Sequence, residues 1–539
     1  MAEVGMFVRK ASGLVRAWSV FDAFIYAFFS INLITLGLYI FSFAPFIPEG
    51  HLVIAIIISA VFILFEIVVY AMLISAMPRA GGDYVWQSRM LGGGIGFVLA
   101  ATGWWFILWH WVPLYASMLA YEVVVPLLTI IAGWTGSKGL LGTALWFMDV
   151  NGLFLTCLMV IGLAFVYVGL GMKWYARIQK TCFYIAMVGL ATVFIVLLAS
   201  SNSSFMASFN SMTASLFGAE GDVYSSIISQ AAQEGYTPVA WGAMPIWASM
   251  PLIPMVVFFN MWPNWGATLY GEVRGASDFR RNFSGMALAL LVTTVLAVIF
   301  LALIAKTIGW DFYHAANWTF WSGSSPLPVF PYPGLLAAFL TQNPLLQVWI
   351  IITMSAWFFG WAGTVFLSST RMIFAAAFDR VLPEWVAQVT PKQRVPFNAL
   401  LLLAIPSIIT SALYCYTPNF ATYTLDATVV IAIMYLGTTV AAILLPYRDP
   451  QLYGSSPVAR YTIFGLPWIV VAGVIFIIFL GYNLYMWIVD PVYGVNHPTS
   501  AVYMVILYLV AIGLYVGSKW YRRKQGIDLD MVYKNIPVE

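Results

Sequence analysis

Long runs of apolar residues recur along the whole chain and constrain its fold more than any other feature of the sequence. A run of about 20 apolar residues crosses a bilayer as one helix. Only 8% of the 539 residues are charged, against about 25% in a soluble domain. The pattern predicts an all-α polytopic membrane protein with twelve transmembrane helices. We place them at 18–46, 52–77, 94–128, 149–170, 178–200, 245–271, 284–306, 346–378, 397–415, 424–446, 461–487 and 500–518.

Basic residues fall almost entirely on one side of this predicted topology. With the N-terminus inside, all but Lys138 and Lys306 of the 24 lysines and arginines lie in inner segments. Cytoplasmic loops carry an excess of Lys and Arg, so the asymmetry indicates that both termini are cytoplasmic. We therefore predict a multi-pass protein of the cytoplasmic membrane, with the lipid bilayer around it.

Composition excludes several other kinds of function. The net charge of +3 provides no basic surface for nucleic acid, and the three cysteines all lie in apolar segments, without the spacing of a metal site. A haem held between helices needs paired histidines at membrane depth, and only His110 lies deep in a predicted helix. We expect no enzyme activity, no cofactor and no metal cluster.

Two of the predicted helices contain polar stretches near mid-membrane. The first helix carries the run from Ser30 to Gly37, and the sixth carries the run from Phe259 to Gly266, where Pro263 removes an N–H group. Such stretches need protein or a cavity beside them. Broken helices at corresponding positions of two halves are typical of secondary transporters with inverted repeats. The breaks therefore predict two five-helix halves.

Three further motifs lie in segments that the topology places inside. They are Met77-Pro78-Arg79-Ala80-Gly81-Gly82-Asp83-Tyr84, Gly271-Glu272-Val273-Arg274, and Ser369-Thr370-Arg371 followed by Asp379-Arg380-Val381-Leu382-Pro383. Together with the run from Ser30 to Gly37, they resemble the motifs of amino acid permeases of the amino acid–polyamine–organocation (APC) superfamily. The matches occur in the expected order and span residues 19–450.

The resemblance implies a leucine-transporter-type fold, a 5+5 inverted repeat with helices 1 and 6 broken, plus two C-terminal helices. It also implies a secondary transporter that moves amino acids or related small organic molecules, amines included, by alternating access. The substrate site would lie between the broken helices, flanked by helices 3 and 8. The expected substrate-binding residues are Ser30, Asn32, Thr35, Gly37, Phe106, His110, Phe258, Asn260, Trp262 and Asn264.

Ionisable residues at membrane depth indicate how transport is coupled to an ion. Asn264 stands where several members of the resembled family carry glutamate, and the fifth predicted helix has only Lys180, at its inner end. The remaining candidates are Glu66 and His110, and buried carboxyls and histidines can both change protonation near neutral pH. We expect proton coupling through one of them, with sodium coupling, exchange and uniport as alternatives.

Two more groups of residues are candidates for gating and ion binding. Charged side chains at the inner mouth are expected to pair as an inner gate, and these are Arg79, Asp83, Glu272, Arg274, Arg371 and Asp379. Hydroxyl groups in the inner half of helix 8 suit a hard cation, which gives a possible sodium site at Ser368, Ser369 and Thr370.

The sequence predicts six segments: a cytoplasmic N-terminal tail (1–17), a first five-helix repeat (18–200), an extracellular loop (201–244), a second five-helix repeat (245–446), helices 11 and 12 (447–518), and a cytoplasmic C-terminal tail (519–539). Two other classes of function stay open. One is a membrane sensor that keeps the fold without transport, and the other is a cofactor-free membrane subunit of an energy-converting complex.

Overall fold

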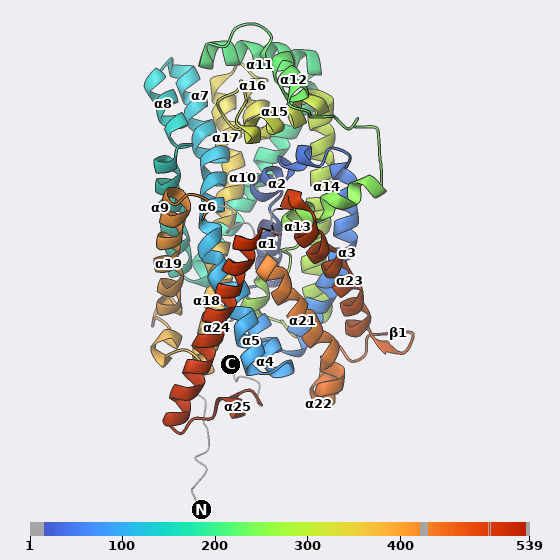
Figure 1. Cartoon of the computed structure of the whole chain (residues 1–539), viewed down its shortest axis with the longest axis vertical. Helices are drawn as coiled ribbons and strands as arrows, with labels where there is room; N and C mark the ends of the chain where they lie inside the picture. The colour runs from blue at the N-terminus through green and yellow to red at the C-terminus, as the bar shows by residue number, and fades with distance from the viewer. Residues whose placement is uncertain (1–13, 15, 421–428, 494, 496, 535–539) are drawn as a thin grey trace, which may run out of the picture.

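Most of the described chain is helical, and its long helices run side by side (Figure 1). The computed structural model describes residues 14, 16–420, 429–493, 495 and 497–534. Within them, eleven helical segments are long and apolar enough to cross a membrane, as the prediction of a multi-pass membrane protein requires. They are Val20–Phe41, Leu52–Ala76, Gly93–Thr135, Val150–Gly169, Met172–Ala199, Phe279–Ser322, Pro344–Phe378, Phe397–Tyr416, Val429–Arg448, Trp468–Val489 and Pro498–Lys524. The first residues of the expected helix 424–446, with Asp426, lie outside the described residues.

The expected helix at 245–271 is not a continuous span, so eleven segments are found where the sequence predicted twelve. The chain there forms a 3₁₀ segment, Trp247–Leu252, then the helix α13, Ile253–Asn260, then a second 3₁₀ segment, Trp265–Glu272. Prolines stand at 251, 254 and 263, and each lacks the N–H that a helix interior needs. The predicted break is therefore present, and the expected helix is divided into three short segments.

The first span is also broken where the sequence predicted it. Helix α1, Val20–Ile31, ends at Asn32, a short π-helical turn follows at Leu33–Gly37, and α2, Leu38–Phe41, completes the span. Asn32 adopts the left-handed conformation, with φ of 46°, which asparagine tolerates better than other side-chain-bearing residues. The local sequence thus interrupts the helix without breaking the membrane crossing.

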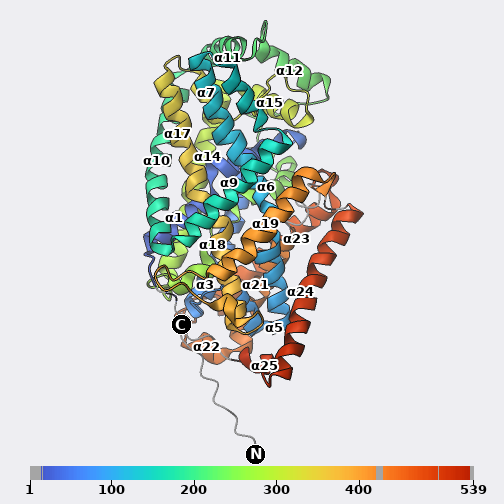
Figure 2. The ribbon, with the colours of Figure 1, turned by 90° about the vertical axis from the view of Figure 1, so that its left-hand side faces the viewer.

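Long helices surround these two broken ones (Figures 1 and 2). The third span consists of α5, Gly93–Ala101, α6, Ile107–Leu119, and α7, Val125–Thr135, joined by π-helical turns at Thr102–Phe106 and Ala120–Val124. The other long helices are α3 (Leu52–Ala76), α9 (Val150–Gly169), α10 (Met172–Ala199), α14 (Phe279–Leu303), α17 (Pro344–Trp361), α18 (Thr364–Phe378), α19 (Phe397–Tyr416), α21 (Val429–Arg448), α23 (Trp468–Val489) and α24 (Pro498–Lys524). Exposed apolar side chains, such as Ile195 on α10 and Ile478 on α23, mark faces that suit lipid.

Short helices cover one end of the molecule, at the top of Figure 1. The segment 201–244, predicted as a loop, contains α11 (Asn202–Phe217) and α12 (Val223–Gln233), each begun by a side-chain cap, from Ser201 and Asp222. Beside them lie α8 (Lys138–Trp146), α15 (Trp310–Ser322) and α16 (Pro333–Phe339). Tyr224 of α12 stacks on Phe312 of α15 at 4.2 Å between ring centroids. This contact joins the predicted extracellular loop, 201–244, to α15.

The opposite end carries smaller elements (Figure 1). They are α4 (Asp83–Met90), α22 (Pro450–Ser455), α25 (Leu529–Val532) and a two-stranded antiparallel hairpin, β1 (Thr462–Ile463) and β2 (Leu466–Pro467), in which Thr462 pairs with Pro467. Helix α24 continues to Lys524, six residues past its predicted end, because its last turns remain helical beyond the apolar run. This end also carries the inner-loop motifs of the sequence.

Candidate functional site

The breaks of the first and sixth helices meet in the middle of the molecule. The aromatic rings of Phe41 and Phe259 lie with centroids 5.1 Å apart. A Cβ atom added to Gly37 would lie 3.0 Å from the ring of Phe259, which is tighter than most real contacts. Glycine at position 37 therefore lets the two interrupted helices pack directly against each other.

Asn32 replaces part of the hydrogen bonding that the first helix loses at its break. Its Oδ1 accepts from the N–H of Thr35 at 3.0 Å, and its Nδ2 donates to the carbonyl of Trp357 on α17 at 3.1 Å. A buried polar group is costly without partners, so this side chain both stabilises the turn and fixes it to α17.

In the sixth helix, polar side chains at the break are held by neighbouring helices. Asn260 Oδ1 accepts from the hydroxyl of Ser59 on α3 at 2.9 Å, and Asn264 Oδ1 accepts from Tyr435 on α21 at 3.2 Å. The indole of Trp262 donates to the carbonyl of Phe258 at 2.6 Å. The Nδ2 groups of both asparagines have no hydrogen-bond partner within the described parts of the chain.

A cavity of about 490 Å³ lies beside these breaks. Thirteen of the 24 described residues that line it are aromatic, and none of the 24 is Asp, Glu, Lys, Arg or His. Three of its partly exposed lining residues lie at α15, where Phe43 stacks on Trp321 at 4.5 Å and Phe46 stacks on Trp318 at 4.8 Å between ring centroids. The full lining is Ser30, Leu36, Tyr39, Ile40, Phe43, Phe46, Ile47, Trp111, Leu114, Tyr115, Met118, Met255, Phe258, Trp262, Trp265, Trp321, Trp361, Thr364, Tyr414, Val429, Trp487, Val492, Tyr493 and Val495.

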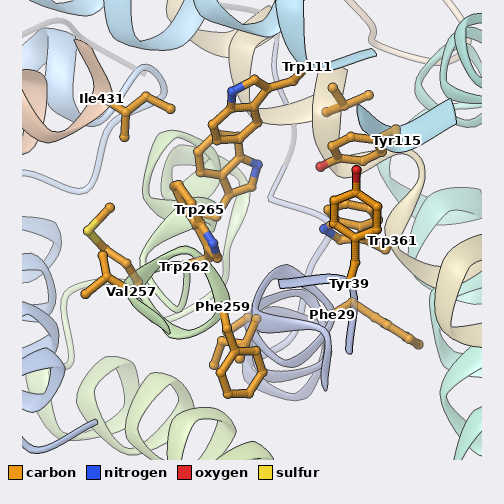
Figure 3. Close-up of a cluster of buried hydrophobic side chains, with 14 of the residues drawn as sticks. Phe29, Tyr39, Trp111, Tyr115, Val257, Phe259, Trp262, Trp265, Trp361 and Ile431 are labelled. Atoms are coloured by element: carbon orange, nitrogen blue, oxygen red, sulfur yellow. The ribbon is translucent and has the colours of Figure 1, made fainter. Parts of the chain in front are cut away.

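Two groups of rings face each other across the space in Figure 3. On one side, Trp111 stacks on Trp265 at 5.7 Å, with 14° between the ring planes, and Trp262 stands at right angles to Trp265 at 5.3 Å. On the other side, Tyr115 stacks on Trp361 at 3.6 Å between ring centroids. The site is thus built from α6, the sixth-helix break and the junction of α17 with α18.

Sequence reasoning missed most of these rings. The α6 residues Trp111, Leu114, Tyr115 and Met118 all line the cavity, and their spacing of three and four residues puts them on one face of a helix. That stripe was the available signal. His110, the polar residue beside Trp111, instead indicated a different face of the same helix.

The structure brings only some of the predicted substrate-binding residues to the cavity surface. Ser30, Phe258 and Trp262 line it. The remaining residues at the breaks are buried and are not part of the lining, and these are Asn32, Thr35, Gly37, Asn260 and Asn264. These residues shape the turns at the two breaks, and residues next to them in the chain form the wall of the cavity.

Phe106 and His110 are directed elsewhere. The ring of Phe106 packs against Trp105 and Trp109. His110 Nδ1 donates to the carbonyl of Phe106 at 2.8 Å, and its Nε2 contacts the hydroxyl of Tyr503 on α24. A carbonyl only accepts, so Nδ1 carries the proton and Nε2 accepts from Tyr503. In this conformation His110 is part of the packing between α6 and α24.

Glu66 lies in the middle of α3 and is fully buried. Neither of its carboxyl oxygens has a hydrogen-bond partner among the residues that the structure describes. One turn later on the same helix, Tyr70 donates to Asp83 at 2.6 Å. An unpaired buried carboxyl is expensive in a membrane and marks a candidate functional group.

The hydroxyls of the possible sodium site are all buried on α18. Ser368 Oγ bonds to Tyr26 of α1 and to the carbonyl of Trp265, each at 2.7 Å. Thr370 donates to the carbonyl of Leu367, whereas Ser369 Oγ has no partner among the described residues. These hydroxyls thus join α18 to both broken helices.

Two buried ion pairs close the end opposite α15. Glu272 pairs with Arg371 of α18 at 2.7 Å, and Asp379 pairs with Arg89 of α4 at 2.6 Å. Both acids and Arg371 were expected to form a gate, but Arg89 was not. Its role was hidden because it lies within α4, which the sequence did not predict as a buried helix.

The other three residues of the expected gate make different contacts. Asp83 is buried and accepts from Tyr70, from Thr438 at 2.6 Å and from the indole of Trp104 at 3.0 Å. Arg274 donates to the carbonyl of Arg16, and Arg79 donates to that of Pro78. Asp83 thus ties the inner loop to α3, the third span and α21.

The described C-terminal residues cover this ion-paired end. Tyr533 is 92% buried, lies 5.4 Å beneath the guanidinium of Arg89, and has its hydroxyl 3.5 Å from that of Tyr84. Tyr84 in turn donates to Asp379 at 3.1 Å. The ring of Tyr533 also occupies the space above Gly93, where a Cβ would lie 1.9 Å from it. The tail is therefore part of the same closed cluster.

Comparison with known protein families matches residues 19–512 to the family described as amino acid permease. No curated protein matches the chain. The matched range covers ten of the eleven spans completely and the eleventh in part, together with the cavity and the buried ion pairs. Among the residues that the structure describes, no group of three or more His, Cys, Asp or Glu side chains is placed to hold a metal ion.

Proposed function

Because the chain belongs to the amino acid permease family, we propose that it carries amino acids or related small organic molecules across the cytoplasmic membrane by alternating access. The observation that carries the proposal is the cavity of about 490 Å³ beside two helix breaks, together with two buried ion pairs that lie at the same end of the described chain. A cavity closed on one side is what a transporter needs in each of its two states.

The proposed architecture is a leucine-transporter-type inverted repeat of residues 18–200 and 245–446. Two observations support it. The first helix of each half is broken, and the two breaks meet. The third helix of each half also contributes to the cavity, where Tyr115 of α6 stacks on Trp361 of α17. Transport would then move one half of the fold against the other around this site.

In this proposal, the end with α4, α22 and α25 is cytoplasmic and the structure is the outward-open form. The concentration of basic residues in the segments at that end supports the orientation. The inner gate is then made by Glu272 with Arg371 and Asp379 with Arg89, while Arg79, Asp83 and Arg274 hold the surrounding loops. Opening inward requires both ion pairs to separate.

Proton coupling is assigned first to Glu66. Both of its carboxyl oxygens lack hydrogen-bond partners among the described residues, whereas both ring nitrogens of His110 are engaged. The sodium alternative rests on Ser369, whose hydroxyl is buried without a described partner. Exchange or uniport would need neither group.

Uptake into proteoliposomes tests the site. We expect Phe258→Ala or Trp262→Ala to reduce uptake of the transported amino acid at least tenfold, because both side chains line the cavity. Trp349→Ala is the matched control, since Trp349 is about half exposed on α17. Equal, small losses in all three variants would remove this cavity as the substrate site.

An imposed pH gradient tests the coupling ion. Without sodium, an acidic exterior is expected to stimulate uptake by the natural sequence, and Glu66→Gln should abolish the stimulation while leaving substrate exchange intact. His110→Gln is the comparison variant. Accumulation driven only by sodium would contradict proton coupling and direct attention to Ser368, Ser369 and Thr370.

A further inference from the structure

The walls of the cavity indicate which amino acids it accepts. Resting on the proposed function, we infer that the substrate is an α-amino acid with a large, uncharged aromatic side chain, whose ring lies between the Trp111–Trp265–Trp262 group and the Tyr115–Trp361 pair. The inference rests on the cavity's size, the arrangement of its rings and the chemistry of its lining.

Size excludes the smallest amino acids as the preferred substrate. At about 490 Å³, the cavity falls within the usual range for small-molecule sites. A glycine or alanine side chain would leave most of the opposing rings without contact, and each missing contact loses dispersion attraction. A large side chain restores these contacts on both sides.

Ring arrangement favours a flat aromatic group. Trp111 and Trp265 are nearly parallel, and so are Tyr115 and Trp361, with 10° between the latter two planes. Within each of these pairs the rings pack face to face. The two groups stand opposite each other across the space (Figure 3). Aromatic rings attract one another in offset-stacked and edge-to-face geometry, and a ring entering between two such walls makes both kinds of contact.

The lining chemistry disfavours charged side chains. A cation could be held over ring faces, but the described lining residues offer no carboxylate to accompany it. The two aliphatic hydroxyls of the lining are already engaged locally, since Ser30 donates to the carbonyl of Tyr26 and Thr364 to that of Trp361. Burying a charge without a partner is costly. An acidic side chain would likewise meet no basic group there.

The test is counterflow uptake by the full chain in proteoliposomes, with labelled phenylalanine, tryptophan, alanine, lysine, glutamate and the polyamine putrescine at equal concentrations. We expect phenylalanine and tryptophan to enter at least tenfold faster than the other four. Fastest uptake of lysine or putrescine would overturn the inference in favour of a cation-binding site, and fastest uptake of alanine would overturn it on size. If none of the six is taken up, the proposed function itself fails.

Variants of the walls supply the second readout. Trp361→Ala and Trp262→Ala should each raise the KM for phenylalanine at least tenfold, with a smaller change for alanine, whereas Trp262→Phe should keep the KM within about threefold because it retains a ring. Trp385→Ala is the control, because Trp385 is half exposed at the opposite end and does not line the cavity. An unchanged preference for phenylalanine in both alanine variants would contradict the assignment of these walls.

Discussion

At the scale of single residues, the pair formed by Glu272 and Arg371 shows how strongly a buried charge depends on its partner. Both side chains are at most 2% exposed, and the guanidinium also donates to Thr370 at 2.9 Å. Removing one member of a buried ion pair leaves the other charge without its partner, which costs roughly 3–5 kcal/mol. The pair therefore contributes to stability only as long as both members remain.

We predict that Glu272→Gln lowers the free energy of unfolding by about 3–5 kcal/mol, measured by thermal unfolding in detergent. Glu272→Arg should additionally favour the inward-open form, seen as faster labelling of a cysteine introduced at Ser369 in a background without the three native cysteines. The double variant with the two charges swapped, Glu272→Arg with Arg371→Glu, should slow the labelling again. Equal labelling of the unsubstituted protein, of Glu272→Arg and of the double variant would show that the pair is not a gate.

His51 is predicted to make stability depend on pH. Burial lowers the pKa of His51 below its usual 6.5, and its ring stacks on Trp310 while Nε2 contacts the carbonyl of Trp241. Nδ1 has no partner among the described residues, so a second proton would be buried without an acceptor. The unfolded chain binds that proton below about pH 6.5, so the stabilisation is complete above this pH and is lost as the pH falls toward the lowered pKa.

The corresponding measurement is Tm at pH 7.5 and pH 5. We expect the decrease in Tm to be several degrees smaller in His51→Gln than in the natural sequence. His497→Gln, at an exposed histidine, should behave like the natural sequence. Identical pH dependence in all three proteins would contradict the assignment to His51.

At the scale of elements, the two breaks were predictable and the aromatic walls were not. Proline, asparagine and glycine mark an interruption locally, because each changes backbone geometry or hydrogen bonding at its own position. The ring pairs instead join α6 to the sixth-helix break and to α17, far apart in the sequence. The stripe at 111, 114, 115 and 118 could be read from spacing, but its partners depend on tertiary packing.

Asn32 provides the prediction for the first-helix break. Asn32→Ala would put alanine, which tolerates the left-handed region less well than asparagine, at this position and would remove both side-chain hydrogen bonds, at a cost of about 2–4 kcal/mol. Asn32→Gly keeps the backbone freedom and loses only the hydrogen bonds, so its Tm should lie between those of Asn32→Ala and the natural sequence. If the Tm of Asn32→Gly were lower than that of Asn32→Ala, the left-handed backbone conformation would not be the reason for asparagine at position 32.

At the scale of the whole molecule, the C-terminal tail is coupled to the ion-paired end. The sequence predicted that the tail lies on the same side as the inner loops, from its basic residues. It did not predict docking, because the fit of Tyr533 over Gly93 and Arg89 depends on a turn after α24 and on α25.

Tyr533 and Gly93 should therefore show strong non-additivity. Gly93→Ala is expected to displace the tail and lower the Tm by a few degrees, whereas adding the same change to Tyr533→Ala should have little further effect, since the ring that it clashes with is gone. Gly142→Ala, at a glycine with open space around its Cβ position, is the control. Additive effects in thermal unfolding would show that the tail is not packed on Gly93.

The uncharged lining of the cavity has an electrical consequence. A zwitterion that enters a site whose described lining contains no Asp, Glu, Lys, Arg or His adds no net charge to the moving complex, so the membrane voltage neither drives nor opposes its passage. Any current that accompanies uptake is then carried by the coupling ion alone. Each such charge gains about 2.3 kcal/mol per 100 mV, equivalent to about a 50-fold concentration gradient. The charge-to-substrate ratio in a reversal-potential measurement would thus report directly how many ions cross with each molecule.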